Sequence, residues 1–534
     1  MKKNAILSLL LAAIMLLASC TNTPAQDTNN PDGTSGQPTS DSSSNTSSPS
    51  GPSGGTDPTP AVPKRTEINF SAAEAFSTFD PHYPILSAES GPIRQMYETF
   101  CLVEDDYTLT PLLAERYEVA EDGVTYTFYL RKGIKFHNGE ELKADDVIFS
   151  LQRAKDSPYQ YPYTYCMTGF EKVDEYTVKI TSEYQFALFA HLVSGIAIVN
   201  EKQCTEAGDS FKEHPCGTGA YYFDSQQPNV SLTLKAFEDS WRGSPSIKTI
   251  NYKVITDPSS ALIAFESGEI DMVSVPTADW EMIKAQNKWE TVLIDTVQTT
   301  YVVYNNEVAP FNDVRVRQAI NHAIDRETMV IIAYDGIAEA ADVMANPHIV
   351  FGATADTTTY EYNPEKARQL LAEAGYPNGL DIPPIQTIGA WIEKVATILQ
   401  SNLADVGIRT TIEMRESADY VTDLISGNYA IGGMNSNVGY DFSIYSALYQ
   451  SNYINSNNLA RYSNPRVDEL FTLGAKTIDP SARQSIYKEL IDILQKDAVY
   501  APVFFVKMAY AYNRDLNYRL RVQGTRLFDC SWKS

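Results

Sequence analysis

The chain has 534 residues and a formal net charge of −25 at pH 7. This excess of acidic side chains argues against a nucleic-acid partner, because phosphates would be repelled, and it is typical of a secreted protein kept soluble by its charge. The length exceeds one small domain and favours two or three domains that share interfaces.

Residues 1–20 predict a secretion signal that ends at a lipid attachment site. Lys2 and Lys3 precede an apolar run over 5–18, which is too short to span a bilayer comfortably. The run ends in Leu-Ala-Ser-Cys, which resembles a bacterial lipobox. This resemblance implies that Cys20 carries diacylglycerol and anchors the mature chain to the outer face of the bacterial cytoplasmic membrane. An ordinary secretory peptide with an incidental cysteine is the alternative.

Residues 21–63 predict a disordered tether. The segment is dominated by Ser, Thr, Pro, Gly, Asn and Asp, which offer too little apolar surface to offset the entropy cost of ordering. A flexible chain of this length reaches roughly 35 Å, enough to hold a folded body clear of a membrane.

Cysteines and histidines in the folded part do not form a recognisable catalytic or metal-binding pattern. Five cysteines remain beyond Cys20, an odd number, and Cys204 with Cys216 is the only close pair and so the candidate for a disulfide. The six histidines are scattered, and the chain has no HExxH, no zinc spacing and no Walker loop. We therefore expect no metal, no other cofactor and no enzyme activity.

The stretch over 113–153 reads as strand, turn, strand, turn and helix. Tyr126, Phe128 and Leu130 alternate with smaller polar or aromatic residues, which predicts an extended strand, and Asp-Gly and Asn-Gly pairs predict the turns. Val147 and Leu151 then follow two aspartates at helical spacing.

As a string, this stretch resembles the signature of the family 5 extracytoplasmic solute-binding proteins, the oligopeptide, dipeptide and nickel receptors of ABC importers. The matching residues are Ala114-Glu115, Asp122-Gly123, Leu130-Arg131-Lys132-Gly133, Phe136, Gly139, Ala144, Asp146-Val147 and Phe149-Ser150. Lys143 departs from the pattern, since the family usually has a threonine there that can cap the helix. Further family strings occur at 216–221, 268–272, 310–320, 363–379 and 462–470, so the resemblance runs from about residue 67 to the end.

Helix signals accompany two of these strings. Asp313 can cap a helix whose buried stripe is Val316, Ala319, Ile320 and Ala323, with Arg315 and Arg317 facing outward. Asn363, followed by proline, predicts the start of another helix, which Gly375 closes.

The resemblance implies an α/β, bilobed, periplasmic-binding-protein-like fold of class II type, with an extra subdomain inserted in the N-terminal lobe. Lobe 1 (domain I) is expected over 64–100, 215–300 and 507–534, the inserted subdomain (domain II) over 101–214, and lobe 2 (domain III) over 301–506. The signal peptide (1–20) and the tether (21–63) precede them.

Candidate ligand-binding residues follow from the same resemblance. Ser87 matches the family loop that enters the ligand cleft, and Ser274 a family stretch that faces it. Tyr301, also a candidate, begins a stretch that resembles a strand crossing into the second lobe. Peptide receptors usually have Gly-Trp-x-x-Asp near residue 433, with the aspartate pairing with a peptide ammonium; here Met434, Asn435 and Asn437 occupy this region. Either Asp441 takes over the role of the aspartate, or the ligand lacks a free ammonium, since a buried unpaired charge is costly.

The function implied is that of an extracytoplasmic receptor, monomeric, which closes over a solute and delivers it to the permease of an ABC transporter. An oligopeptide or dipeptide is the leading ligand, and a nickel chelate, heme or an oligosaccharide stays open within the family. Candidates from other classes are a secreted lipoprotein hydrolase and a surface signal receptor or adhesin.

Overall fold

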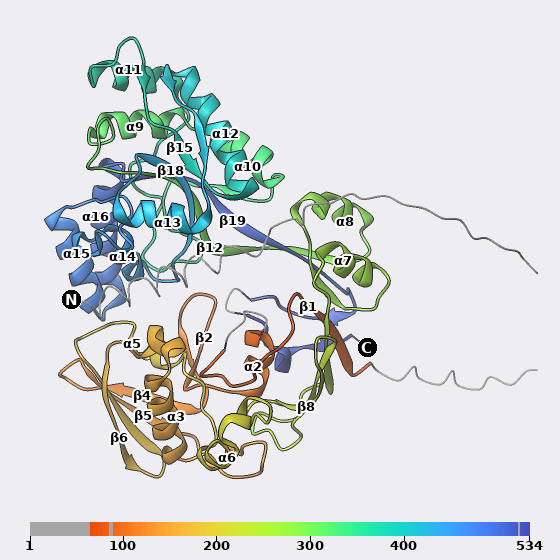
Figure 1. Ribbon diagram of the computed structural model, residues 1–534. Coiled ribbons are helices and arrows are strands. Elements are labelled where there is room, and N and C mark those ends of the chain that lie inside the picture. The colour runs from red at the N-terminus through yellow and green to blue at the C-terminus, as the bar shows by residue number, and fades with distance from the viewer. Residues whose placement is uncertain (1–64, 85–88, 522–523, 534) are drawn as a thin grey trace, which may run out of the picture.

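Two long neighbouring strands, β12 (Glu290–Tyr304) and β19 (Tyr500–Tyr512), run through both halves of the molecule (Figure 1). The computed structural model describes residues 65–84, 89–521 and 524–533, without the side chains of 390 and 391. The signal peptide, the tether, Cys20 and Ser87 therefore lie outside the described residues. The two strands pair antiparallel, and their register shifts between Asp295 and Thr299. This irregularity marks the passage from one lobe to the other.

Lobe 1 surrounds the first part of the β12–β19 ladder. β19 pairs with β11 (Met272–Ser274), and the sheet continues through β1, β10, β9 and β8. Their bounds are β1 (Glu67–Ala72), β10 (Thr249–Val254), β9 (Ser231–Ala236) and β8 (Tyr221–Gln227). Helices and short pairs complete the lobe: α2 (Ser90–Met96), α7 (Pro258–Glu266), η4 (Thr277–Asp279), α8 (Trp280–Gln286), β20 (Leu516–Asn517), η7 (Leu527–Asp529) and β21 (Ser531–Trp532).

The signature stretch forms a separate four-stranded sheet in the order β4-β5-β7-β6. Tyr126, Phe128 and Leu130 of β5 are buried, as their alternation predicts. Lys143 at the start of α3 supplies no cap, and instead the Asp146 carboxylate accepts the Lys143 backbone N–H at 3.0 Å. The elements are β4 (Ala114–Val119), β5 (Thr125–Leu130), β6 (Met167–Asp174), β7 (Thr177–Ser182), α3 (Ala144–Asp156), η2 (Pro158–Gln160), α4 (Tyr161–Thr164), α5 (Phe189–Val193), α6 (Glu201–Ala207) and η3 (Gly208–Lys212), beside the hairpin β2 (Cys101–Val103) and β3 (Leu109–Pro111).

Lobe 2 is built on the second part of the same ladder. There β12 pairs with β18 (Ile431–Asn437), and β15 (Ile385–Thr387) and β17 (Ile412–Met414) extend the sheet with parallel pairing. Helices cover both faces: α9 (Val314–Ala323), α10 (Arg326–Tyr334), α11 (Pro364–Glu373), α12 (Gly389–Asp405), α13 (Ser417–Ser426), α14 (Ser446–Tyr449), α15 (Pro465–Lys476) and α16 (Pro480–Lys496). Short elements are β13 (Glu339–Ala340), β14 (Leu380–Asp381), β16 (Ile408–Arg409), η5 (Phe442–Tyr445) and η6 (Ser451–Tyr453).

The helix signals of lobe 2 are confirmed, with one correction. Asp313 caps α9 through the Arg315 backbone N–H at 2.9 Å, and Asn363 caps α11 through the Lys366 N–H at 2.9 Å. The expectation that Arg317 faces outward is wrong. Its guanidinium is buried and donates to the backbone carbonyls of Phe311, Asp497 and Ala498. Buried backbone carbonyls require hydrogen-bond donors, and Arg317 supplies them here.

Two adjacent glycines let helices approach both faces of β18. A Cβ on Gly432 would lie 2.3 Å from the Tyr420 hydroxyl oxygen, and one on Gly433 would lie 2.8 Å from Cγ2 of Ile392. Tyr420 belongs to α13, and Ile392 to the first turn of α12. The Gly-Gly pair therefore fixes where the two helices sit on the sheet.

The candidate disulfide between Cys204 and Cys216 is not formed. Both are separate buried thiols, as are Cys101, Cys166 and Cys530. Burial raises the pKa of the Cys204 and Cys216 thiols to about 11, which keeps them protonated and unreactive.

Candidate functional site

The two lobes touch through an aromatic contact at the tip of the β2–β3 hairpin. Tyr107 stacks on His191 of α5, with ring centroids 4.6 Å apart, and on Tyr440 of lobe 2 at 5.8 Å. Tyr107 has a φ of 63°, a left-handed conformation that turns its ring out of the hairpin. A backbone hydrogen bond from Ala187 N to Ala475 O, 2.9 Å, joins the inserted subdomain to lobe 2 as well. The two lobes are therefore in contact at this edge.

His191 is held neutral within this contact. Its Nε2 lies 2.8 Å from the Tyr107 carbonyl oxygen and donates to it, which leaves Nδ1 buried without a partner. Burial is the main cause that lowers the pKa of His191. A neutral ring suits the stack, because a buried proton on Nδ1 would face no acceptor.

A second aromatic group lies where the inserted subdomain meets lobe 2. The ring centroids of Tyr161, in α4, and Tyr165, just after it, lie 6.1 Å apart, and those of Tyr165 and Phe186 lie 6.4 Å apart. Tyr453 of η6 lies close enough to Tyr165 to raise its pKa, although burial is the larger cause. The loop that follows Tyr453 is held by a dense polar network.

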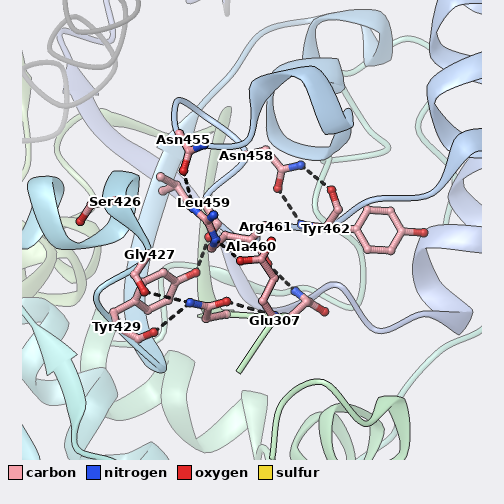
Figure 2. Close-up of polar contacts among 12 residues, drawn as sticks. Glu307, Ser426, Gly427, Tyr429, Asn455, Asn458, Leu459, Ala460, Arg461 and Tyr462 are labelled. Carbon is pink, nitrogen blue, oxygen red and sulfur yellow. Dashed lines mark hydrogen bonds and ion pairs between the residues drawn. The ribbon is translucent and has the colours of Figure 1, made fainter. Parts of the chain in front are cut away.

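Figure 2 shows this network around Asn458 and Arg461. The Asn458 amide donates to the Tyr462 carbonyl at 2.8 Å. It also donates to the carbonyls of Tyr449 and Gln450, at 3.1 Å each. Arg461 pairs with Glu307 at 2.5 Å and donates to the Asn455 side chain at 2.8 Å. These bonds tie the loop after Tyr453 to the segment that follows β12 and to α14.

Asp441 is paired within lobe 2. Its carboxylate, 1 % exposed, forms an ion pair with Arg483 of α16 and accepts the Ser443 backbone N–H at 2.9 Å, which caps η5. Arg483 also lies over the Phe351 ring, 4.6 Å from its centroid. A ligand ammonium would have to share this carboxylate with Arg483, so the expected pairing of Asp441 with a ligand stays a prediction.

The other candidate residues are distributed over two faces of the sheet. Tyr301 and Met434 are register partners on one face, where both are buried in the core of lobe 2. Asn435, 8 % exposed, lies on the opposite face, and Asn437 is exposed at the end of β18. Ser274 is exposed on β11 of lobe 1, opposite Tyr510. The structure thus brings Tyr301 together with Met434 and keeps Ser274 apart, and their ligand contacts stay predictions.

Two threonines without a sequence signal lie on the same face of the lobe 2 sheet as Asn435. Thr300 of β12 is the register partner of Asn435, and Thr387 ends β15, just before α12 begins. Both are fully buried, and both hydroxyls lack a hydrogen-bond partner. Buried polar groups without partners are uncommon in folded proteins.

Within the described ranges, no three His, Cys, Asp or Glu side chains gather as a metal would require. In the same ranges, no helix combines the length and the apolar character that crossing a bilayer demands.

Comparison with known proteins gives one consistent result. The family model described as bacterial extracellular solute-binding proteins, family 5 Middle, matches residues 108–457. Heme-binding protein A of Haemophilus influenzae is 30% identical over 430 residues, which cover 74% of this chain and 78% of that protein. The glutathione-binding protein GsiB of Salmonella paratyphi A is 28% identical over 458 residues, 83% of this chain and 89% of that protein.

Among solved structures, HbpA2 from Haemophilus parasuis superposes with a TM-score of 0.81 at 25% identity, over 88% of this chain and 100% of that one. The two-lobed α/β fold expected from the sequence is thereby confirmed.

Proposed function

Because this chain belongs to the bacterial extracellular solute-binding proteins of family 5, we propose that it captures an extended small ligand, an oligopeptide or dipeptide, between its lobes and delivers it to an ABC-transporter permease. The ligand leaves chemically unchanged.

The observation that carries this proposal is the way the lobes are joined. Among the strands that the structure describes, only β12 and β19 run through both halves of the sheet. Their register shifts between Asp295 and Thr299, and again between Thr300 and Tyr301, where the chain passes between lobes. A strand pair with a local irregularity can bend there while each lobe keeps its own core. A ligand that contacts both lobes then favours the closed form, in which Tyr107 meets Tyr440.

The chemistry of the relatives' ligands supports a small organic acid as cargo. Two relatives are named for binding heme and glutathione. Heme carries propionate groups and glutathione is a tripeptide with two free carboxylates, so carboxylates are common to both ligands. A peptide fits this chemistry, as does a carboxylate chelate of nickel, while a neutral oligosaccharide fits it less well. Heme or a nickel chelate is therefore the alternative cargo.

We propose further that Cys20 is lipidated, and that residues 21–63 tether the body to the outer face of the cytoplasmic membrane. The support is the Leu-Ala-Ser-Cys sequence and the composition of the tether. Globomycin, an inhibitor of lipoprotein signal peptidase, should make the full-length precursor accumulate in the producing cell. A Cys20→Ser variant has no thiol at residue 20, so mass spectrometry should find no acyl group on it.

The test of binding without turnover uses the purified protein and a defined peptide pool. Mass spectrometry should find one peptide retained per protein, and the same intact peptide recovered after denaturation. Cleavage products in the supernatant would instead indicate a hydrolase. Retention of heme or of a nickel chelate, and of no peptide, would move the assignment to another ligand class of the same family.

A further inference from the structure

Strand β19 has a short stretch, at the passage between the lobes, where its pairing changes on both sides (Figure 1). On one side, β13 of lobe 2 pairs with it up to Phe505, and β11 of lobe 1 pairs with it from Tyr510 onward. On the other side, its register with β12 shifts between Asp295 and Thr299. Lys507 lies in the middle of this stretch, and Asp295 is its register partner, the last one on the lobe 1 side of the shift.

Lys507 pairs with two carboxylates at this point. Its Nζ lies 3.2 Å from Oδ1 of Asp295 and 2.6 Å from Oε2 of Glu339, and all three side chains are partly buried. The Asp295 oxygen has no hydrogen-bond partner, so its contact with Lys507 is an ion pair only. Register partners and their diagonal neighbours share one face of a sheet, which is why the three side chains meet. One ammonium thus joins the end of the lobe 1 ladder to β13 of lobe 2.

Lobe 2 also touches lobe 1 just before β13. Ile337, 2 % exposed, packs in the apolar cluster of lobe 1 that contains Val273 of β11 and Trp280 of α8. Two residues earlier in the chain, the Asp335 carboxylate accepts a hydrogen bond from the Thr277 hydroxyl of η4 at 2.6 Å. A buried apolar side chain resists separation of the lobes, because separation would expose it, but it permits rotation about itself. We take this contact as the pivot between the lobes.

Rotation about this pivot changes the distance between Asp295 and Glu339. Glu339 lies two residues beyond Ile337 and pairs in the lobe 2 part of the sheet, whereas Asp295 belongs to the lobe 1 part of the ladder. His348 of lobe 2 contacts the other oxygen of Glu339 at 3.0 Å, so this carboxylate is held within its own lobe. The two ion pairs of Lys507 therefore form together only over a narrow range of lobe orientations.

Loss of the ammonium would have two effects in the same direction. The attraction that joins the lobes would disappear, and two carboxylates that now share one partner would repel each other. We propose that Lys507 is a positioning residue of the hinge, which holds the lobes at the separation where Tyr107 meets Tyr440. The inference rests on the proposed receptor function only for its effect on ligand binding, because lobe separation can be measured without a ligand.

The test measures lobe separation in the ligand-free protein by electron–electron double resonance. Spin labels are attached through Gln227→Cys, at the exposed end of β8 in lobe 1, and Glu365→Cys, an exposed position of α11 in lobe 2. The chain also carries Cys20→Ser. The five cysteines that the structure describes are buried, so labelling is confined to the introduced thiols.

Four hinge and control variants are compared in this background. Lys507→Met removes the ammonium, Glu339→Gln removes the lobe 2 carboxylate, and Lys507→Arg keeps a cation. Lys235→Met is the matched control, because Lys235 pairs with Asp224 at 2.8 Å across β9 and β8, two strands of lobe 1 alone. Thermal melting of each variant checks that it folds.

We expect the same narrow distance distribution for the unaltered hinge, for Lys507→Arg and for Lys235→Met. Lys507→Met should shift the distribution to longer distances, and Glu339→Gln should shift it in the same direction by less, since no second carboxylate then faces Asp295. Retention from a defined tripeptide pool, measured by native mass spectrometry, should fall about threefold in Lys507→Met, because affinity follows the fraction of molecules whose lobes are poised to bind.

Other outcomes overturn the inference. A distribution in Lys507→Met that matches the unaltered hinge would do so, as would an equal shift in Lys507→Arg or in Lys235→Met. If Lys507→Met fails to fold, Glu339→Gln decides alone, and an unshifted distribution in that variant rejects the role of Lys507. Retention of no peptide by any of these proteins would count against the peptide-receptor proposal, while the distances would still decide the role of Lys507.

Discussion

The ring of Tyr107, in lobe 1, stacks on the ring of Tyr440, in lobe 2, with centroids 5.8 Å apart. Aromatic pairs of this kind contribute about 0.5–1.5 kcal/mol beyond their buried area. Since the pair exists only when the lobes meet, its energy favours the closed form without stabilising either lobe alone.

Replacing Tyr440 with alanine should therefore open the lobes. We expect ligand affinity to fall by several-fold to about tenfold and the radius of gyration of the ligand-free protein to rise in small-angle X-ray scattering. Tyr362→Ala, which removes an exposed tyrosine of lobe 2, is the control and should leave both unchanged. An unaltered affinity and radius in Tyr440→Ala would show that the stack does not contribute to closure.

The ion pair between Asp441 and Arg483 gives a second prediction. Both side chains are buried, so Asp441→Asn leaves the Arg483 charge without its partner, and we expect the free energy of unfolding of lobe 2 to fall by about 3 kcal/mol. Urea unfolding measures this change. Asp356→Asn breaks an ion pair that is exposed to solvent, with Lys488, and should cost under about 1 kcal/mol.

The same variant tests the expectation that Asp441 binds a peptide ammonium. If it does, Asp441→Asn should weaken a peptide with a free amino terminus far more than its N-acetylated form. Equal effects on the two peptides would assign Asp441 to lobe 2 stability alone.

Much of the scaffold could be predicted from the sequence, because its signals are local. The caps at Asp313 and Asn363 and the alternation around Phe128 each depend on a few neighbouring residues, and the structure has them all. The direction of Arg317 could not be read in this way. Its acceptors at Asp497 and Ala498 come from a segment about 180 positions away, so only the assembled lobe decides that it points inward.

The candidate site was harder to predict for a related reason. Which face of β18 each residue takes depends on its register with β12, and this register places Met434 in the core and Asn435 on the α12 side. Thr300 and Thr387 carry no sequence signal of their own. Their unpartnered hydroxyls become apparent only once β12 and β15 pair on either side of β18.

The glycine pair of β18 supports a prediction about packing. Gly432→Ala would place a methyl group 2.3 Å from the Tyr420 hydroxyl oxygen, and that hydroxyl donates to the Gly433 carbonyl at 2.8 Å. We expect loss of this bond and a free energy of unfolding lower by about 2 kcal/mol. Gly169→Ala, in β6, is the matched control, since its methyl group would meet nothing within 4 Å. A Gly432→Ala protein as stable as the control would contradict this account of β18.

The buried thiols should be unreactive in the folded protein. Burial raises the pKa of Cys166, Cys204 and Cys216 to about 11 and that of Cys530 to about 12, so almost none is a thiolate at neutral pH. Iodoacetamide should label these cysteines only after denaturation, as measured by peptide mass spectrometry. A cross-linked peptide that contains Cys204 and Cys216, found without reductant, would show that the disulfide forms after all.

Two buried histidines should make the fold sensitive to acid. Burial lowers the pKa of His82 and of His137 to about 4. The neutral His82 ring donates from Nε2 to the Ala197 carbonyl at 2.8 Å and accepts from Arg153 at Nδ1, 3.1 Å. His137 likewise donates to the Gly219 carbonyl and accepts the Gly217 N–H. A second proton on either ring would therefore face a donor.

The sign of the effect follows from these depressed values. In the unfolded chain both histidines bind a proton near pH 6.5, whereas in the folded chain they resist it until about pH 4. Their contribution to stability is thus complete above pH 6.5 and is lost as the pH falls from 6.5 toward 4, by on the order of 3 kcal/mol per histidine at most. Urea unfolding at pH 7, 6 and 5 should show the decline. Carbon-13 NMR of labelled imidazoles, assigned with His82→Asn and His137→Asn, should find both rings neutral at pH 5, and a ring that titrates near 6.5 would refute its assignment as a buried neutral group.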